Sequence, residues 1–282
     1  IMPSLVGSEM CIRDSIYPMA TAFDTKLENF QALTLTELNA QASYLKRIDR
    51  KFLLTKDQFA EILEDLKEDF QVLEIAGKKV FSYDNVYMDT DEYLFYNQHQ
   101  DKYKTRTKIR TRLYKDSDMA FFEFKQKING ITQKFRYQFP SEEHGIMTKG
   151  KKRFFEWVWQ SMYQGTPQAP HIFPSIKTAY KRITLVEKTG GERLTIDFSV
   201  KTLDLRDEDA KDIKLKNLVI IESKSLWDDC ISGKIMEKHG IAEASSCSKY
   251  SLGVVYSGLA KKHDTFDQTM KEIAKIKSEM KK

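Results

Sequence analysis

Residues 104–112 read Lys-Thr-Arg-Thr-Lys-Ile-Arg-Thr-Arg, with a basic residue at every second position. Side chains at alternate positions of a β-strand lie on the same face of the sheet. A strand here would therefore present one cationic row made of Lys104, Arg106, Lys108, Arg110 and Arg112. The intervening threonines and isoleucine are β-branched, which favours a strand over a helix. Because like charges at strand spacing repel one another, we expect the row to bind a polyanion such as phosphate.

The same separation of charged from apolar side chains recurs in other segments that are typical of strands. Residues 119–127 alternate phenylalanines with charged residues, and residues 131–139 alternate aromatic with basic ones. The polar faces of these and three later segments carry Glu123, Lys125, Lys127, Lys134, Arg136, Tyr180, Arg182, Asp197, Glu222 and Lys224. For one strand alone, the simplest interpretation is a sheet with a core side and a solvated side. Solvated faces usually mix both signs, however, so the excess of cations predicts a cationic tunnel.

The order of the elements favours an α+β fold, with an antiparallel closed β-barrel and flanking helices. Thr55 and Gln58 form a capping box for a helix that runs to Phe70, and Asn129-Gly130 predicts a hairpin turn. Strands are expected at 46–54, 80–89, 103–114, 119–127, 131–139, 178–187, 193–200, 217–224 and 249–254. Further helices are expected within 30–44, over 151–164, and from a cap at Ser225 to His239.

Length and composition limit the class of protein. The 282 residues include 31% charged side chains but carry a formal net charge of only +5, which does not indicate a coat for nucleic acid. No apolar run is long enough for a transmembrane span. The histidines and cysteines lack metal-ligand spacing. We therefore expect a cytoplasmic protein in which Cys230 and Cys247 are free thiols.

Four regions are expected along the chain. Residues 1–15 resemble translated sequencing-adapter sequence, so we set them aside as foreign to the native protein. A helical lead-in is expected over 16–45 and the barrel domain over 46–258. Residues 259–282 predict a Lys-rich helix or tail, solvated or in contact with a membrane or another partner.

Eight short motifs, taken in order, resemble the VTC domain, which is the polyphosphate polymerase domain of the vacuolar transporter chaperone complex. This family is related to the CYTH proteins and the triphosphate tunnel metalloenzymes, and the form seen here resembles bacterial stand-alone members. The motifs are Arg47-Ile48-Asp49-Arg50-Lys51-Phe52, Tyr87-Met88-Asp89-Thr90, Ile109-Arg110-Thr111-Arg112-Leu113-Tyr114, Phe122-Glu123-Phe124-Lys125, Lys134-Phe135-Arg136, Tyr180-Lys181-Arg182, Ile221-Glu222-Ser223-Lys224 and Ser248-Lys249-Tyr250. The resemblance implies a basic tunnel in which ATP binds by its triphosphate and a polyphosphate chain grows outward.

The resemblance also implies roles for individual residues. At the reaction centre it places Lys249, Arg110, Arg112 and Lys125. Other contacts to ATP or polyphosphate would come from Lys51, Lys108, Lys127, Lys134, Arg136, Tyr180, Arg182, Lys224 and Ser248. A divalent ion, Mn²⁺ or Mg²⁺, would be bound by Glu222 and Glu123, although Glu123 could instead only pair with cations. Many tunnel enzymes begin with Glu-X-Glu-X-Lys, whereas this chain has Asp49 at the second acidic position and no acid at the first.

Other functions stay open beside an ATP-dependent polyphosphate polymerase. In a tripolyphosphatase or nucleoside triphosphatase, water would attack with Asp49, Glu123 or Asp197 as the base. A third alternative is a non-catalytic module that binds polyphosphate or nucleotide. RNA binding is disfavoured, because the aromatic residues alternate with the basic ones and so leave the phosphate face, whereas stacking modules need both on one surface. The motifs favour the polymerase, with no nucleic-acid partner.

Overall fold

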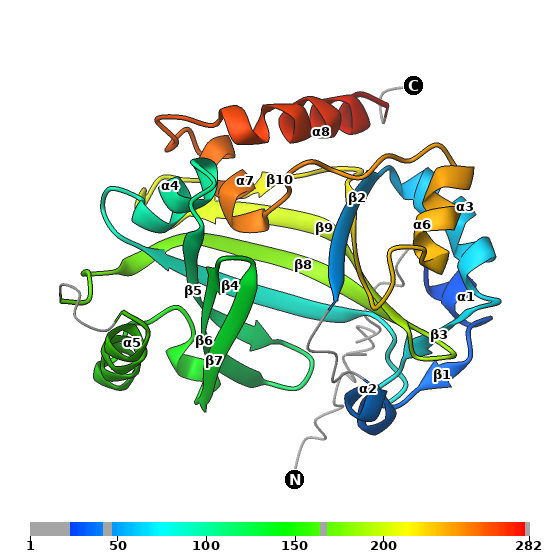
Figure 1. Cartoon of the computed structure of the whole chain (residues 1–282), viewed down its shortest axis with the longest axis horizontal. Helices are drawn as coiled ribbons and strands as arrows, with labels where there is room; N and C mark the ends of the chain where they lie inside the picture. Colours follow the sequence, from blue (N-terminus) through cyan, green and yellow to red (C-terminus); the bar gives the residue numbers. More distant parts are fainter. Residues whose placement is uncertain (1–22, 42–46, 164–167, 280–282) are drawn as a thin grey trace, which may run out of the picture.

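The computed structural model describes residues 23–41, 47–163 and 168–279. The segment at 1–15, expected to be foreign, lies outside these ranges. The described residues form eight α-helices: α1 (Asp24–Leu27), α2 (Leu35–Gln41), α3 (Lys56–Leu66), α4 (Leu94–Gln100), α5 (Lys149–Met162), α6 (Ile231–Lys238), α7 (Lys249–Tyr256) and α8 (Asp267–Glu279). The strands are β1 (Ala32–Leu33), β2 (Ile48–Leu54), β3 (Phe70–Leu73), β4 (Phe81–Asp89), β5 (Thr105–Tyr114), β6 (Met119–Ile128), β7 (Ile131–Phe139), β8 (Phe173–Glu187), β9 (Glu192–Asp204), β10 (Ile213–Lys214) and β11 (Val219–Ser225). Figure 1 shows their arrangement.

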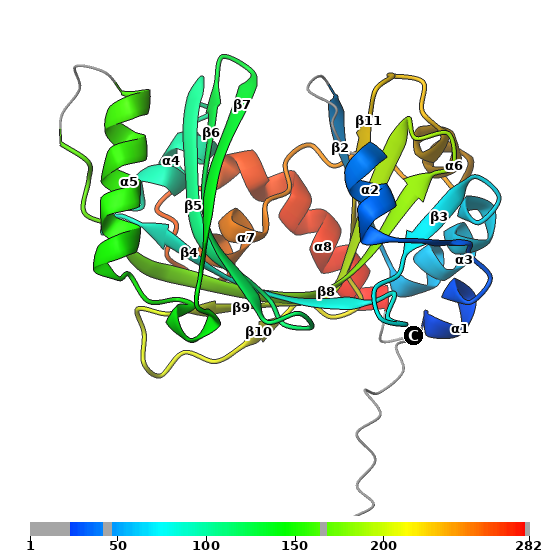
Figure 2. The same cartoon turned by 90° about the horizontal axis from the view of Figure 1, so that it is seen from below.

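One strongly curved sheet forms the centre of the molecule. Eight strands pair in the order β2-β11-β9-β8-β4-β5-β6-β7, and each of these pairs is antiparallel. The two strands that end this order, β2 and β7, do not pair with each other in the described ranges. The α+β prediction is therefore confirmed, but the closed barrel is wrong: the sheet is a half-barrel with an open side between β2 and β7 (Figure 2).

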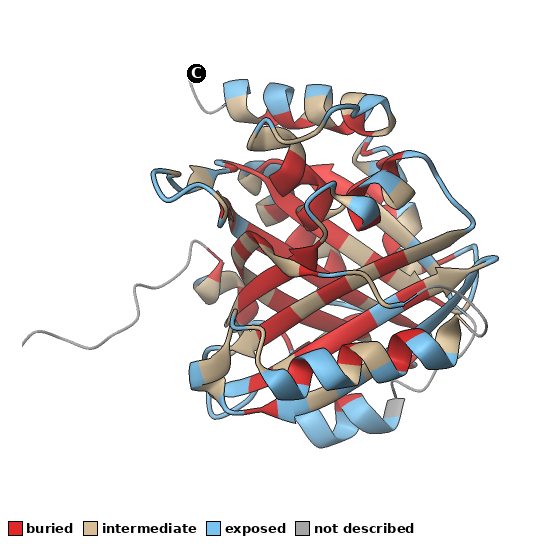
Figure 3. Cartoon of the chain, turned by 90° about the vertical axis from the view of Figure 1, so that its left-hand side faces the viewer, coloured by how far each residue is buried: buried red, intermediate tan, exposed pale blue. Residues whose placement is uncertain are grey.

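Apolar cores hold helices against the convex face of the sheet. Phe59 and Ile62 of α3 pack with Ile221 of β11, and Phe155 of α5 packs with Phe124 of β6. Burial of each such side chain stabilises the fold by about 1.5–3 kcal/mol relative to exposure. Figure 3 shows the sheet largely buried and the outward surfaces of the helices exposed. The charged faces of the strands therefore lie on the concave side.

A further core closes part of the concave side. Leu252 of α7 and Ile273 of α8 pack with Leu53 of β2 and Ile220 of β11. α7 also lies against β8 and β9, and its N-terminus consequently reaches the charged face of the sheet.

Several local predictions are confirmed and others are wrong. The capping box is present: Gln58 N donates to Thr55 Oγ1 at 3.1 Å, and Thr55 N donates to Gln58 Oε1 at 2.9 Å. α3 ends at Leu66, because Phe70 already begins β3. The helix expected within 30–44 is β1 followed by the short α2, and the helix expected from Ser225 begins only at α6.

The predicted strand at 249–254 is wrong, because these residues belong to α7. Ser248 caps this helix by accepting a hydrogen bond from Ser251 N. The expected C-terminal helix is present as α8. Cys230 and Cys247 are free, as predicted, and both are buried. None of the described helices is long and apolar enough to cross a membrane.

Candidate anion-binding site on the concave face

The register of the strands brings the predicted residues onto one surface. Arg110 lies opposite Glu123 on β6, which lies opposite Arg136 on β7. Across the half-barrel, Lys51 of β2 lies opposite Glu222 of β11. We call this surface the ionic face, and its charged members are Asp49, Lys51, Arg106, Lys108, Arg110, Arg112, Glu123, Lys125, Lys127, Lys134, Arg136, Arg182, Arg193, Asp197, Glu222, Lys224 and Lys249. Cations outnumber carboxylates on it.

The floor of the half-barrel, formed by β9, β8, β4 and the end of β5 that carries Arg112, holds a buried acid between two cations. Arg182 donates to both oxygens of Asp197, at 2.6 and 2.7 Å, and Lys249 of α7 pairs with the same carboxylate. Burial alone would raise the pKa of Asp197, but Arg182 and Lys249 outweigh it and hold the pKa below its ordinary value. Asp197 therefore stays charged and fixes the N-terminus of α7 to the floor.

Arg112 is the cation of the floor that lacks an acidic partner. Its Nε donates to Asn85 Oδ1 at 2.8 Å and one Nη donates to Tyr180 OH at 3.3 Å. The guanidinium also lies 5.4 Å from the ring centroid of Tyr83. Among the described residues no carboxylate pairs with Arg112, although only 8% of the residue is exposed. A buried cation that pairs with no carboxylate is suited to an anionic ligand.

Glu123 lies on the wall formed by β5–β7 and is held by two cations. Arg110 Nη2 lies 2.6 Å from its carboxylate, and Lys134 Nζ also lies 2.6 Å from it. Burial would raise the pKa of Glu123, but these cations with Arg112 lower it well below its ordinary value. The alternative in which Glu123 only pairs with cations therefore fits its surroundings better than a metal-ligand role.

The opposite wall, formed by β2 and β11, carries a second group of charges. Glu222 pairs with Lys224 and lies 3.8 Å from Lys51 Nζ. Lys224 Nζ also lies 3.6 Å from Asp49. Burial opposes the charge of Glu222, yet Lys224 and Lys51 hold its pKa well below the ordinary value. Two carboxylates, Glu222 and Asp49, thus flank one lysine on neighbouring strands.

The two walls face each other closely enough for their charges to interact. Burial lowers the pKa of Lys108 to about 7, with repulsion from Lys125 and Lys51 adding to it. Burial also lowers the pKa of Lys125 to about 8, and the charges of Glu222 and Lys224 act on it from the other wall. Lys108 Nζ donates to Ser248 Oγ at 2.8 Å. Lysines crowded in this way gain stabilisation when an anion binds between them.

Some predicted residues lie away from this centre. Arg136 is exposed, and its guanidinium lies 4.9 Å from the ring centroid of Phe121. Lys127 is opposite Arg106 near the ends of β5 and β6. Lys104 of the quoted stretch precedes β5 and is exposed.

The structure also adds residues to the ionic face that the sequence analysis missed. Arg193 lies opposite Lys224, and its buried Nε has no hydrogen-bond partner among the described residues. Arg193, Thr195 and Asp197 alternate along β9, and this spacing indicates that Arg193 lies on the same face as Asp197.

Tyr83 and Tyr87 lie on the ionic face beside the expected Tyr180, contrary to the expectation that aromatic residues which alternate with basic ones leave it. Tyr83, Tyr87 and Tyr180 share the face with the arginines. Tyr87 and Tyr180 are 6% and 5% exposed, and Arg182 lies over the Tyr180 ring. Because Tyr87 and Tyr180 are buried, these two rings offer little surface on which bases could stack.

A metal ion bound here would need ligands from the substrate as well as from the protein. The described residues contain no cluster of three or more His, Cys, Asp or Glu side chains able to hold one. Mg²⁺ and similar ions are, however, commonly bound by one or two carboxylates together with substrate phosphates. Glu222 and Asp49, which both pair with Lys224, fit this arrangement.

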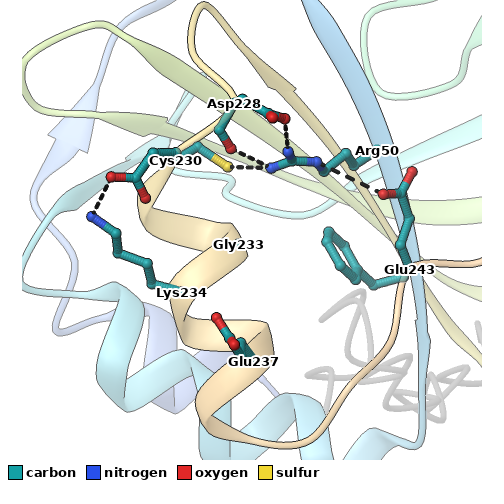
Figure 4. A pocket seen from close by; sticks show the side chains of 9 residues that line it. Arg50, Asp228, Cys230, Gly233, Lys234, Glu237 and Glu243 are labelled. Atoms are coloured by element: carbon teal, nitrogen blue, oxygen red, sulfur yellow. Dashed lines mark hydrogen bonds and ion pairs between the residues drawn. The ribbon is translucent and has the colours of Figure 1, made fainter.

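A separate pocket lies on the convex side of β2 (Figure 4). It has a volume of about 310 Å³ and is lined by Arg50, Phe52, Asp228, Asp229, Cys230, Gly233, Lys234, Glu237 and Glu243. Arg50 donates to Asp228 O at 2.7 Å and lies 3.7 Å from Glu243. Because acids outnumber bases in this pocket, it does not suit a polyanion.

The chain belongs to the VTC domain family, since the family's sequence profile matches residues 46–257. None of the curated proteins matches the sequence. Among solved structures, a candidate adenylyl cyclase from Hippeastrum with a dominant triphosphatase activity has a TM-score of 0.43 at 14% identity, covering 77% of this chain and 100% of its own. A candidate adenylate cyclase from Bacillus halodurans has a TM-score of 0.42 at 13% identity, covering 72% and 94%. Similarity at this level carries no argument about activity.

Proposed function

We propose that this protein is a polyphosphate polymerase-like phosphotransferase, which moves the γ-phosphate of ATP onto a polyphosphate chain with a divalent metal. The observation that carries the proposal is the ionic face, on which cations from strands and α7 converge. Membership of the VTC domain family supports phosphate chains as the ligand. Free buried thiols accord with a cytoplasmic location, which is part of the proposal.

Phosphoryl transfer depends on positioning and charge neutralisation more than on covalent chemistry by the protein. In this mechanism Arg112 and Arg110 hold the triphosphate oxygens. Lys249, held by Asp197, neutralises charge near the transferred group. Lys108 and Lys125 hold the acceptor chain in line with it. A divalent ion would stabilise the charge that develops during transfer, and Glu222 with Asp49 would hold it.

The state of the carboxylates favours transfer to a phosphate chain over hydrolysis. A hydrolase benefits from a free base that takes a proton from water. Glu123 and Asp197, two of the three candidates for that base, are both held in ion pairs that lower their pKa values. A terminal phosphate oxygen is already anionic and needs no such base, so the polymerase is the better-supported activity.

The test is to incubate purified protein with γ-labelled ATP and Mn²⁺ and to separate the products on a gel. A ladder of polyphosphate is expected. Labelled orthophosphate alone would show a hydrolase, and unchanged ATP would show a binding module. The matched variants are Arg182→Ala on the ionic face and its neighbour Lys181→Ala on the convex face. Only the first is expected to abolish the ladder.

A further inference from the structure

On the ionic face, two charged side chains at the edges of the sheet are more exposed than two on its floor. On the floor, Arg112 is 8% and Asp197 is 1% exposed. At the two edges of the sheet, the side chains of Lys134 on β7 and Asp49 on β2 are 41% and 36% exposed. The inward residues of β7, namely Thr132, Lys134, Arg136 and Gln138, are all exposed. In a closed barrel β2 and β7 would pair and these side chains would face an enclosed interior, whereas in the described ranges the two strands do not pair with each other.

The exposed edges still belong to the same site as the buried floor. Lys134 of β7 and Arg110 of β5 both form ion pairs with Glu123, so these ion pairs connect the edge strand β7 to β5. On the other side, Asp49 of β2 and Glu222 of β11 both form ion pairs with Lys224. In the described ranges the site is therefore a trough with a basic floor and two charged edges, and its side between β2 and β7 is open.

We infer that polyphosphate enters this trough sideways, through the open side between β2 and β7, so that an internal segment binds without a free chain end. The inference rests on the proposed function, because it concerns the polyphosphate that the same site would extend. A closed tunnel can be entered only by threading an end. An open trough instead accepts any segment whose phosphates reach the floor.

This geometry defines a class of ligand. A polyphosphate that is cyclic or blocked at both ends presents the same internal phosphates as a linear chain. It offers no terminal oxygen, so the active site cannot extend it. Such a chain is therefore expected to bind and to compete with elongation of linear primers, without becoming a product.

The experiment uses a long polyphosphate with biotin at both ends, with and without streptavidin on the biotins. Binding to the full-length protein is measured by calorimetry in chelator, without ATP. Sideways binding predicts dissociation constants that agree within about threefold, whereas a threaded tunnel predicts a loss of at least about a hundredfold, or 2.7 kcal/mol. Arg112→Ala should weaken both chains alike, and Lys181→Ala on the convex face should change neither.

Each outcome separates the inference from the proposed function. If the unblocked chain binds and the streptavidin-blocked chain does not, sideways entry is overturned and the polymerase proposal stands. If neither chain binds, the polymerase proposal fails and takes the inference with it. If both chains bind but Arg112→Ala weakens neither, the chain binds outside the trough, which also overturns the inference.

Discussion

At the scale of single residues, the carboxylates of the ionic face differ in how completely they are enclosed. The Glu123 side chain is 2% exposed between Arg110 and Lys134, whereas that of Glu222 is 25% exposed beside two lysines. An acid that keeps contact with solvent can exchange a lysine for a metal ion more easily than an enclosed acid can.

Glu222→Gln is therefore expected to reduce turnover by about a hundredfold or more, while metal-free polyphosphate binding is retained or strengthened. Product formation and calorimetric binding in chelator provide the two measurements. Turnover equal to that of the parent protein would contradict the metal role. The comparison variant Glu222→Asp, which keeps the charge, should restore part of the metal-dependent rate.

Lys108 gives the ligand-free site a dependence on pH. Because its pKa is lowered to about 7, it carries its charge below pH 7 and loses it as the pH rises. Phosphate binds the charged form, so affinity should fall between pH 6 and pH 9, by about tenfold for one charge-assisted contact. Lys125, with a pKa of about 8, contributes over the same range.

The measurement for Lys108 is the affinity for long polyphosphate across this pH range, because internal phosphates do not titrate there. The variant Lys108→Met should bind more weakly at pH 6 and show a flatter profile. His99 does not complicate the profile, since burial and the nearby Lys108 and Arg106 lower its pKa far below this range. An unchanged slope in Lys108→Met would contradict the assignment.

At the scale of elements, α7 is the helix that brings Ser248 and Lys249 to the ionic face, and Gly253 lets it approach. A Cβ at this glycine would lie 2.5 Å from Ile176 Cγ2 and 2.5 Å from Thr202 Oγ1, so one of these neighbours would have to move. Overpacking of this kind typically costs about 1–3 kcal/mol.

Gly253→Ala should therefore lower the melting temperature and, by displacing α7, weaken the hydrogen bond between Lys108 and Ser248. Thermal unfolding and polyphosphate affinity would both report it. Ser257→Ala, just after the same helix, is the control and should leave both unchanged. A fully stable Gly253→Ala protein would show that α7 packs less closely than the structure indicates.

The sequence predicted most of the strands because each has one apolar and one charged face. It failed at α7, where Leu252, Val254 and Val255 form an apolar run that is compatible with a strand or with a buried helix. It also failed at the barrel's closure. Alternation determines which face of β2 and β7 points inward, but not whether their edges meet. Arg193 was missed because its row includes only one other charged residue, Asp197.

At the scale of the whole molecule, a short ligand and a long one should contact different parts of the trough. ATP has a short triphosphate that fits on the floor, where Arg112 is buried and weakly screened by salt. A long chain also reaches the edges, where Arg136 is exposed. Charges that face solvent lose most of their attraction when the ionic strength rises.

Arg112→Ala should therefore weaken ATP and polyphosphate to similar extents, by about tenfold or more. Arg136→Ala should weaken only polyphosphate and should reduce the slope of log affinity against log salt by about one. Titrations of both ligands at several KCl concentrations measure these quantities. If Arg136→Ala weakened ATP as strongly as polyphosphate, the nucleotide would extend to the edge of the sheet, and the division into floor and edges would be wrong.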